Sequence, residues 1–235
     1  MQTRLSVYLP GDRNGPTSTQ RTMYLLHGLS DAADAWLMNT AVCRYAGETN
    51  TAVIMPEVHR SFYLDLPDGS AYFTYLTDEL PGLCTKLFAI NTDPVRTMIA
   101  GNSMGGYGAL KSFFSIPQKY QGGCFAFSPL ISIKDLEKDL PGGKRDFDID
   151  SIGGRSVADR PENDLHALSI KLPQTMPGPY ITCGTEDYLY LRNTSFHNYL
   201  IMNAVDHAFH PQSGAHDWKF WDSALCDVFK KIADK

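Results

Sequence analysis

Short strand-like runs alternate with stretches of helical periodicity along most of the chain. Runs typical of strands lie at residues 4–9, 22–26, 52–56, 97–100, 123–128, 179–183 and 207–210. The stretches between them predict helices over 33–46, 72–87, 107–114, 193–204 and 219–231, with a break or kink expected at Pro81. Strands that alternate with helices predict an α/β fold, a mainly parallel sheet flanked by helices.

The pattern weakens between residues 129 and 178, where Gly, Pro and charged residues interrupt the apolar positions. A long irregular insertion after a sheet strand is more often a lid or binding loop than filler. We therefore predict a single domain over residues 1–235, with a cap or lid inserted at about 129–178. A surface excursion without a role in the site is the alternative that the sequence leaves open.

The composition of the chain bears on its binding partners and its cellular compartment. The chain has 235 residues, a formal net charge of -5 and no basic run or stripe, which argues against a nucleic-acid partner. No apolar stretch approaches the roughly 20 residues that span a bilayer. The alternating start lacks the apolar segment of a signal peptide, so we expect a cytoplasmic protein, with a signal removed before residue 1 as the open alternative. Five cysteines without CxxC spacing suit free thiols in a reducing compartment.

One turn carries the most specific chemical motif. The pattern G-x-S-x-G spans Gly101 to Gly105, between the apolar run 97–100 and a predicted helix, with Ser103 at its centre. A nucleophile on a strand-to-helix turn needs strained backbone angles, and the glycines remove side chains that would crowd it. The N–H of Met104 would then face a developing oxyanion. The alternative is an ordinary tight turn between strand and helix with no catalytic role. Whether Ser103 is a nucleophile therefore depends on finding a base and an acid to accompany it.

A second loop follows the predicted strand at 22–26. Its sequence His27-Gly28-Leu29 suits an oxyanion loop, in which Gly28 lets the backbone turn and the Leu29 N–H faces the nucleophile. Taken alone, this motif is better explained by an ordinary loop with a buried, hydrogen-bonded His27.

Three further residues are candidate substrate contacts. Trp36, in the predicted helix 33–46, is either a core residue or a pocket wall, and the core is favoured. Tyr63 and Asp65 lie in the 57–71 loop. Because that loop follows a strand end, it either lines the site or is solvated.

The acid and the base of a catalytic triad follow Ser103 in the chain. Asp187 and His216 each lie in a loop just beyond a predicted strand, where parallel sheets bind their ligands. A histidine there would take the serine proton as general base, and a carboxylate would fix its tautomer and stabilise the imidazolium. Asp217 is expected to cap the last helix. The rivals are Glu186 and Asp206 for the acid and His210 for the base.

The sequence gives little support for a metal site. His207 and His210 could form a pair of ligands, but no third ligand with suitable spacing accompanies them. We therefore predict that the chain binds no metal.

Four segments resemble one known family: YLLHGL, AGNSMGGYGAL, CGTEDYLY and SGAHDWKFW. They are similar to the esterase D group of α/β-hydrolases, and most similar to bacterial tributyrin, acetyl and feruloyl (cinnamoyl) esterases. The resemblance implies the α/β-hydrolase fold, with Ser103 as nucleophile, Asp187 as acid, His216 as base, and the Leu29 and Met104 N–H groups as oxyanion hole. It also implies no cofactor, small acyl groups and frequent homo-oligomers.

The expected function is that of a serine carboxylesterase. It would hydrolyse short-chain acyl esters such as acetyl and butyryl esters, including acetylated or feruloylated carbohydrates, through an acyl-enzyme intermediate. The expected partners are small-molecule or carbohydrate esters, with no nucleic acid and no membrane. The alternatives are a thioesterase of the S-formylglutathione hydrolase type, an acyltransferase on the same triad, or a binding module. S-formylglutathione hydrolases usually carry His where this chain has Tyr107, which weighs against the thioesterase.

Overall fold

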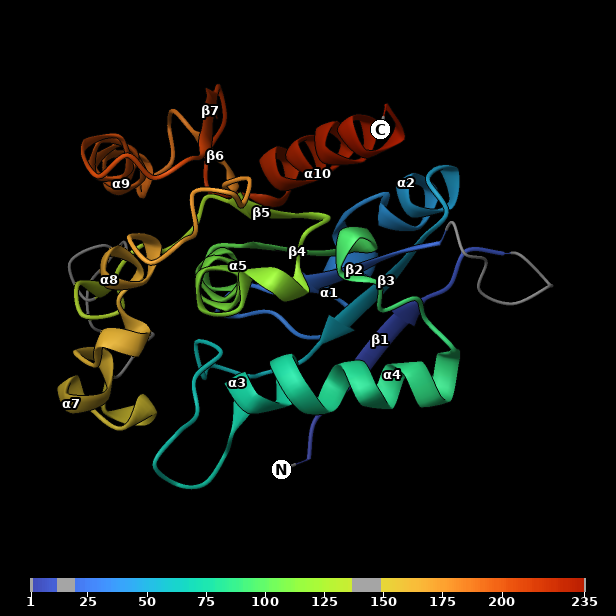
Figure 1. The fold of residues 1–235 in the computed structure, drawn as a ribbon, viewed down its shortest axis with the longest axis horizontal. Helices are drawn as coiled ribbons and strands as arrows, with labels where there is room; N and C mark the ends of the chain where they lie inside the picture. The colour runs from blue at the N-terminus through green and yellow to red at the C-terminus, as the bar shows by residue number, and fades with distance from the viewer. Residues whose placement is uncertain (1, 12–19, 137–148, 235) are drawn as a thin grey trace.

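The computed structural model describes residues 2–11, 20–136 and 149–234. Within these residues, one sheet holds seven strands in the order β1-β3-β2-β4-β5-β6-β7 (Figure 1). The edge strand β1 (Leu5–Tyr8) is antiparallel to β3, and the other pairs are parallel. The parallel strands are β2 (Arg21–Leu26), β3 (Thr51–Pro56), β4 (Thr97–Asn102), β5 (Gly123–Phe127), β6 (Tyr180–Gly184) and β7 (Ala208–Gln212). The predicted α/β fold is confirmed.

Helices connect the strands. The α-helices are α1 (Ala35–Asn39), α2 (Val42–Glu48), α3 (Tyr72–Thr74), α4 (Leu80–Phe88), α5 (Met104–Ser115), α7 (Arg155–Ala158), α8 (Leu165–Ser169), α9 (Tyr190–Met202) and α10 (Trp218–Ala233). A π-helix, η1 (Tyr75–Glu79), joins α3 to α4. Short 3-10 turns lie at η2 (Pro94–Arg96), η3 (Pro117–Lys119), η4 (Ile149–Ile152) and η5 (Pro161–Asn163).

The sheet is buried on both faces, which explains why its strands read as apolar runs. Alternate residues of β2 show this: Tyr24 and Leu26 belong to one apolar cluster, and Met23 and Leu25 to the other. The first cluster also contains residues of the helices α3, α4, α5, α7, α8 and α9. The second contains α1, α2 and α10, and Figure 1 shows α2 and α10 together on their side of the sheet.

Two predicted helices differ in detail from the structure. The predicted helix 33–46 is two helices, because Thr40 is extended (φ -139°, ψ 168°) and ends α1. Its hydroxyl bonds to the Trp36 carbonyl and to the backbone N–H of Val42, so it satisfies the backbone groups that the break exposes.

Pro81 does not break the helix that contains it. Proline has no N–H to donate to the carbonyl of Thr77, four residues earlier. The π-turn of η1 lies at this point, and the Lys119 ammonium donates to the Thr77 carbonyl at 2.8 Å instead. The chain therefore continues as helix from Tyr72 to Phe88.

The predicted cap lies partly outside the described residues, since these omit 137–148. Its later part forms α7 and α8, and α8 packs on α5. The Tyr107 hydroxyl on α5 donates to the Asn163 carbonyl at 2.7 Å, which ties this part to the helix that follows Ser103. Its role as a lid stays a prediction.

The structure also bears on two expectations from composition, namely free cysteines and the lack of a membrane-spanning segment. All five cysteines are free thiols, as expected. Among the described residues, each helix is too short or too polar to cross a membrane.

Candidate active site

Ser103 occupies the turn between β4 and α5. Its backbone has φ +54° and ψ -116°, a conformation that few residues with a side chain adopt. A Cβ on Gly101 would lie 2.5 Å from the Gly105 carbonyl oxygen, and one on Gly105 would lie 2.4 Å from that of Leu26. The G-x-S-x-G pattern is therefore required by close backbone contact, and it presents the Ser103 side chain at the carboxyl edge of the sheet.

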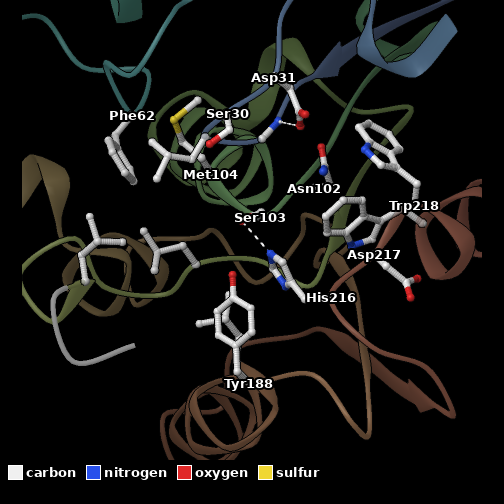
Figure 2. A pocket seen from close by; sticks show the side chains of 16 residues that line it. Ser30, Asp31, Phe62, Asn102, Ser103, Met104, Tyr188, His216, Asp217 and Trp218 are labelled. Carbon is white, nitrogen blue, oxygen red and sulfur yellow. Dashed lines mark hydrogen bonds between the residues drawn. The ribbon is translucent and has the colours of Figure 1, made fainter. Parts of the chain in front are cut away.

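The structure brings Ser103, His216 and Asp187 into one hydrogen-bonded chain. His216 Nε2 lies 3.0 Å from the Ser103 Oγ, and Figure 2 shows this contact. His216 Nδ1 lies 2.8 Å from Asp187 Oδ2, and the Asp187 side chain is 0% exposed. The other oxygen of that carboxylate accepts the Leu189 N–H at 2.8 Å. A buried carboxylate held in this way favours the tautomer with the proton on Nδ1 and leaves Nε2 free to accept the serine proton.

The rival residues lie elsewhere. Glu186 is exposed and accepts the Gly214 N–H, while Asp206 accepts the Gly178 N–H at 2.8 Å. His210 is exposed and stacks on Tyr180, with ring centroids 4.8 Å apart. Each of these rivals therefore has a local structural role away from Ser103.

The two backbone N–H groups expected in an oxyanion hole belong to residues that line the same cavity as Ser103. These residues are Leu29, just after β2, and Met104, the first residue of α5. An N–H in the first turn of a helix has no partner within that helix, so the Met104 N–H is available to an anion.

His27 is buried and hydrogen-bonded, as the more conservative interpretation of the His-Gly motif predicted. Its Nε2 accepts the Val58 N–H at 3.0 Å, and its Nδ1–H donates to the Gly28 carbonyl at 2.7 Å. The Tyr63 hydroxyl donates to the His27 carbonyl at 2.9 Å. Burial lowers the pKa of His27, which keeps the ring neutral. These bonds fix the loop that carries Leu29.

A cavity of about 530 Å³ lies over Ser103. One side of it is apolar and comes from the cluster around α5; we call Phe62, Leu130, Leu136 and Leu189 the apolar wall. The other side is nearer α10; we call Asp31, Asn102, Asp217, Trp218 and Trp221 the polar wall. Figure 2 shows Phe62 on one side of the Ser103–His216 pair and Asp31, Asn102, Asp217 and Trp218 on the other.

None of the three candidate substrate contacts lines this cavity, and we do not retain them. Trp36 is 0% exposed, donates its indole N–H to the Leu26 carbonyl and packs edge-on against Trp218. Tyr63 is fully buried, and its hydroxyl is used by His27. Asp65 accepts hydrogen bonds from the backbone and the hydroxyl of Thr74.

Sequence reasoning missed the aromatic side chains that contact His216. The rings of Tyr188 and Trp221 lie 4.4 Å and 4.9 Å from the imidazole, measured between centroids. Trp221 belongs to the apolar stripe of the predicted helix 219–231, which by itself predicts a core residue, and Tyr188 follows Asp187 directly. The sequence could have indicated these contacts, because both aromatic residues lie within five positions of the predicted acid or base. Asp217 caps α10 by accepting the Phe220 N–H, as expected.

Within the part of the chain that the structure describes, no group of three or more His, Cys, Asp or Glu side chains could hold a metal ion. His207 does not pair with His210. It hydrogen-bonds to His197, with 2.7 Å between Nε2 and Nδ1.

The comparisons with known proteins agree with this geometry. The family model "Esterase", described as "Putative esterase", matches residues 1–232. The chain belongs to this family of α/β-hydrolases. It is therefore an esterase of the serine hydrolase class.

Three relatives illustrate the range of the family. An acetyl esterase from Caldicellulosiruptor saccharolyticus is 29% identical, over 91% of this chain and 85% of the relative. The substrate-bound structure of the Staphylococcus aureus fluorophosphonate-binding serine hydrolase FphF is 30% identical, with a TM-score of 0.88 over 100% of this chain and 94% of that one. The S-formylglutathione hydrolase FrmB from Staphylococcus aureus is 29% identical, with a TM-score of 0.85 over 98% and 92%.

Proposed function

We propose that this esterase is a serine carboxylesterase that hydrolyses short-chain acyl esters through an acyl-enzyme on Ser103. His216 acts as the base, Asp187 as the acid that orients it, and the N–H groups of Leu29 and Met104 as the oxyanion hole. The observation that carries the proposal is the chain of hydrogen bonds from Ser103 Oγ through His216 to Asp187.

Acylation begins when His216 Nε2 takes the proton from the Ser103 hydroxyl as its oxygen attacks the ester carbonyl. The resulting oxyanion lies toward the N–H groups of Leu29 and Met104, where fixed dipoles stabilise the developing charge. His216 then gives its proton to the departing alcohol. The buried Asp187 carboxylate stabilises the imidazolium meanwhile.

Deacylation repeats these steps with water. His216 takes a proton from water as it attacks the acyl-enzyme, the oxyanion forms in the same place, and Ser103 leaves with the proton returned. The products are a carboxylic acid and a regenerated hydroxyl. No cofactor is needed for this cycle.

We expect the cavity to accept short acyl groups. The apolar wall provides hydrocarbon surface beside Ser103, and the volume of about 530 Å³ must also accommodate the alcohol part of the ester. The acetyl esterase relative at 29% identity supports acetyl esters as substrates. Acetylated or feruloylated carbohydrates are the natural substrate class we propose.

A second candidate is a thioesterase of the S-formylglutathione hydrolase type. The likeness to FrmB over almost the whole chain favours it. Tyr107, where such enzymes usually carry His, is 0% exposed and outside the cavity lining. This difference therefore affects packing against Asn163 rather than the cavity.

The test is hydrolysis of p-nitrophenyl esters from acetate to octanoate, together with methyl ferulate and S-formylglutathione, by wild type and Ser103→Ala. We expect the highest kcat/KM on acetate or butyrate, falling at octanoate, and loss of activity in the variant. A kcat/KM on S-formylglutathione that exceeds every oxygen ester would favour the thioesterase. Oxygen-ester turnover that survives Ser103→Ala would contradict the proposal.

A further inference from the structure

The polar wall carries two carboxylates that the reaction steps above do not use. Asp31 Oδ2 accepts the Gly28 N–H at 3.1 Å, and Asp217 Oδ1 accepts the Phe220 N–H at 2.9 Å. Both side chains are therefore held at the cavity by backbone donors. Figure 2 shows them on the same side of the Ser103–His216 pair.

Among the cavity-lining residues that the structure describes, none is Lys or Arg. By sequence, residues 137–148 contribute four acidic and three basic side chains, so they add no net positive charge to the molecule. A group bound at the polar wall thus meets a net negative potential.

The same wall holds polar groups without partners. Asn102 is 0% exposed and Trp221 is 6% exposed. The Asn102 amide and the Trp221 indole nitrogen have no hydrogen-bond partner among the described residues, although both residues line the cavity. These atoms are themselves covered from solvent, so they add to the polarity of this wall without contacting a bound molecule; the charged groups that the wall presents to one are Asp31 and Asp217.

The polar wall suits the alcohol part of an ester rather than the acyl part. A short hydrocarbon acyl group gains most by contact with the apolar wall. Asp217 directly follows His216, the residue that hands its proton to the departing alcohol. A polar alcohol at this wall would therefore lie close to its proton donor.

We infer that Asp31 and Asp217 make the enzyme select esters of neutral or cationic alcohols and reject those with anionic leaving groups. This inference rests on the proposed function and deepens it. It separates the two candidate functions as well, since the glutathione leaving group carries two carboxylates and one ammonium and is a net anion.

The experiment uses acetate esters of three phenols, which carry a 4-trimethylammonio group, no substituent or a 4-carboxylate. The enzymes are wild type, Asp31→Asn, Asp217→Asn and the control Asp34→Asn. Asparagine keeps an acceptor for the Gly28 N–H and is a good helix cap, so both test variants retain their local hydrogen bonds. Asp34 is exposed, makes no side-chain cap bond and does not line the cavity.

The readout is the ratio of kcat/KM for the cationic ester to that for the anionic ester. Dividing each variant's ratio by the wild-type ratio cancels the intrinsic reactivity of the esters. We expect each test variant to lower the ratio about fivefold, from the Coulomb energy of one charge several Å away in a solvated cavity. The wild-type preference should also shrink between roughly 0.01 M and 1 M salt, as screening shortens from about 30 Å to about 3 Å.

Ratios unchanged in both Asp31→Asn and Asp217→Asn would overturn the inference. So would an equal fall in Asp34→Asn, because the effect would then come from the overall charge. Failure of wild type to hydrolyse phenyl acetate, or hydrolysis that survives Ser103→Ala, is a different result, under which the proposed function itself fails and the inference falls with it.

Discussion

Ser103 holds its unusual backbone conformation because hydrogen bonds on both sides fix it. Its N–H donates to the Phe127 carbonyl at 2.9 Å, and its own carbonyl accepts the N–H groups of Tyr107 and Leu130 at 3.0 Å and 3.1 Å. A non-glycine residue in such a region costs about 1–3 kcal/mol and persists only where its surroundings over-determine it. At the residue scale, the site is thus preformed around Ser103.

Substitution of each proposed triad residue should reduce turnover by a characteristic factor. Ser103→Ala and His216→Ala should each cost on the order of 10⁶ in kcat, and Asp187→Asn roughly 10⁴, because the asparagine would favour the wrong histidine tautomer. The measurement is p-nitrophenyl acetate hydrolysis by purified variants of confirmed folding. Glu186→Gln is the matched control and should remain near wild type, since Glu186 is exposed and bonds only to neighbouring groups. A near-normal Asp187→Asn beside an inactive Glu186→Gln would transfer the acid role to Glu186.

At the scale of elements, the site depends on how closely α5 approaches the sheet. A Cβ on Gly105 would lie 2.4 Å from the Leu26 carbonyl oxygen, so the helix can reach this position only with glycine there. The same contact sets the distance between Ser103 and the loop that carries Leu29. The packing of α5 and the geometry of the proposed oxyanion hole are therefore coupled through one residue.

Gly105→Ala should lower both stability and activity. The added Cβ would meet backbone atoms of Leu26 and His27, which cannot turn aside as a side chain can. We therefore expect a loss of about 1–3 kcal/mol in the free energy of unfolding, as for overpacked cores. Gly82→Ala is the control, because a Cβ there meets nothing within 4 Å and Gly82 lies exposed in α4. It should gain up to about 1 kcal/mol from helix propensity. Denaturant unfolding of both variants measures this, and equal stabilities would refute the packing argument.

At the scale of the whole molecule, much of the fold can be predicted from the pattern of apolar residues in short stretches of the sequence. Strands buried on both faces read as apolar runs, and the loops after them carry Ser103, Asp187 and His216, which the structure brings within hydrogen-bond distance. The walls of the cavity could not be predicted in this way. Trp36 and Trp221 both occupy apolar helical patterns, yet only Trp221 lines the cavity, because that depends on how α1 and α10 pack together.

The stability of the whole fold should fall as pH drops below about 6.5, the ordinary pKa of histidine. Burial lowers the pKa of His27 in the folded state, so below that pH the unfolded chain binds a proton that the folded chain does not. The contribution of the neutral His27 ring to the free energy of unfolding is fully present above pH 6.5. It is lost, at up to about 1.4 kcal/mol per pH unit, as pH falls toward the lowered pKa. Denaturant unfolding at pH 7.5 and 5.5 measures the change. NMR titration of the His27 ring should give a midpoint below the ordinary pKa of histidine, and a midpoint at or above that value would contradict the lowered pKa of the buried ring.

Covalent labelling of the nucleophile tests most directly whether Ser103 is the activated serine of this esterase. Wild type, Ser103→Ala and His216→Ala are each treated with a fluorophosphonate, which reacts with activated serine hydroxyls, and the modified peptide is located by mass spectrometry. We expect a stoichiometric label on Ser103 in wild type, none on the corresponding peptide in Ser103→Ala, and labelling slowed by orders of magnitude in His216→Ala. A label on another residue, or a Ser103→Ala protein that reacts as fast as wild type, would contradict this role of Ser103.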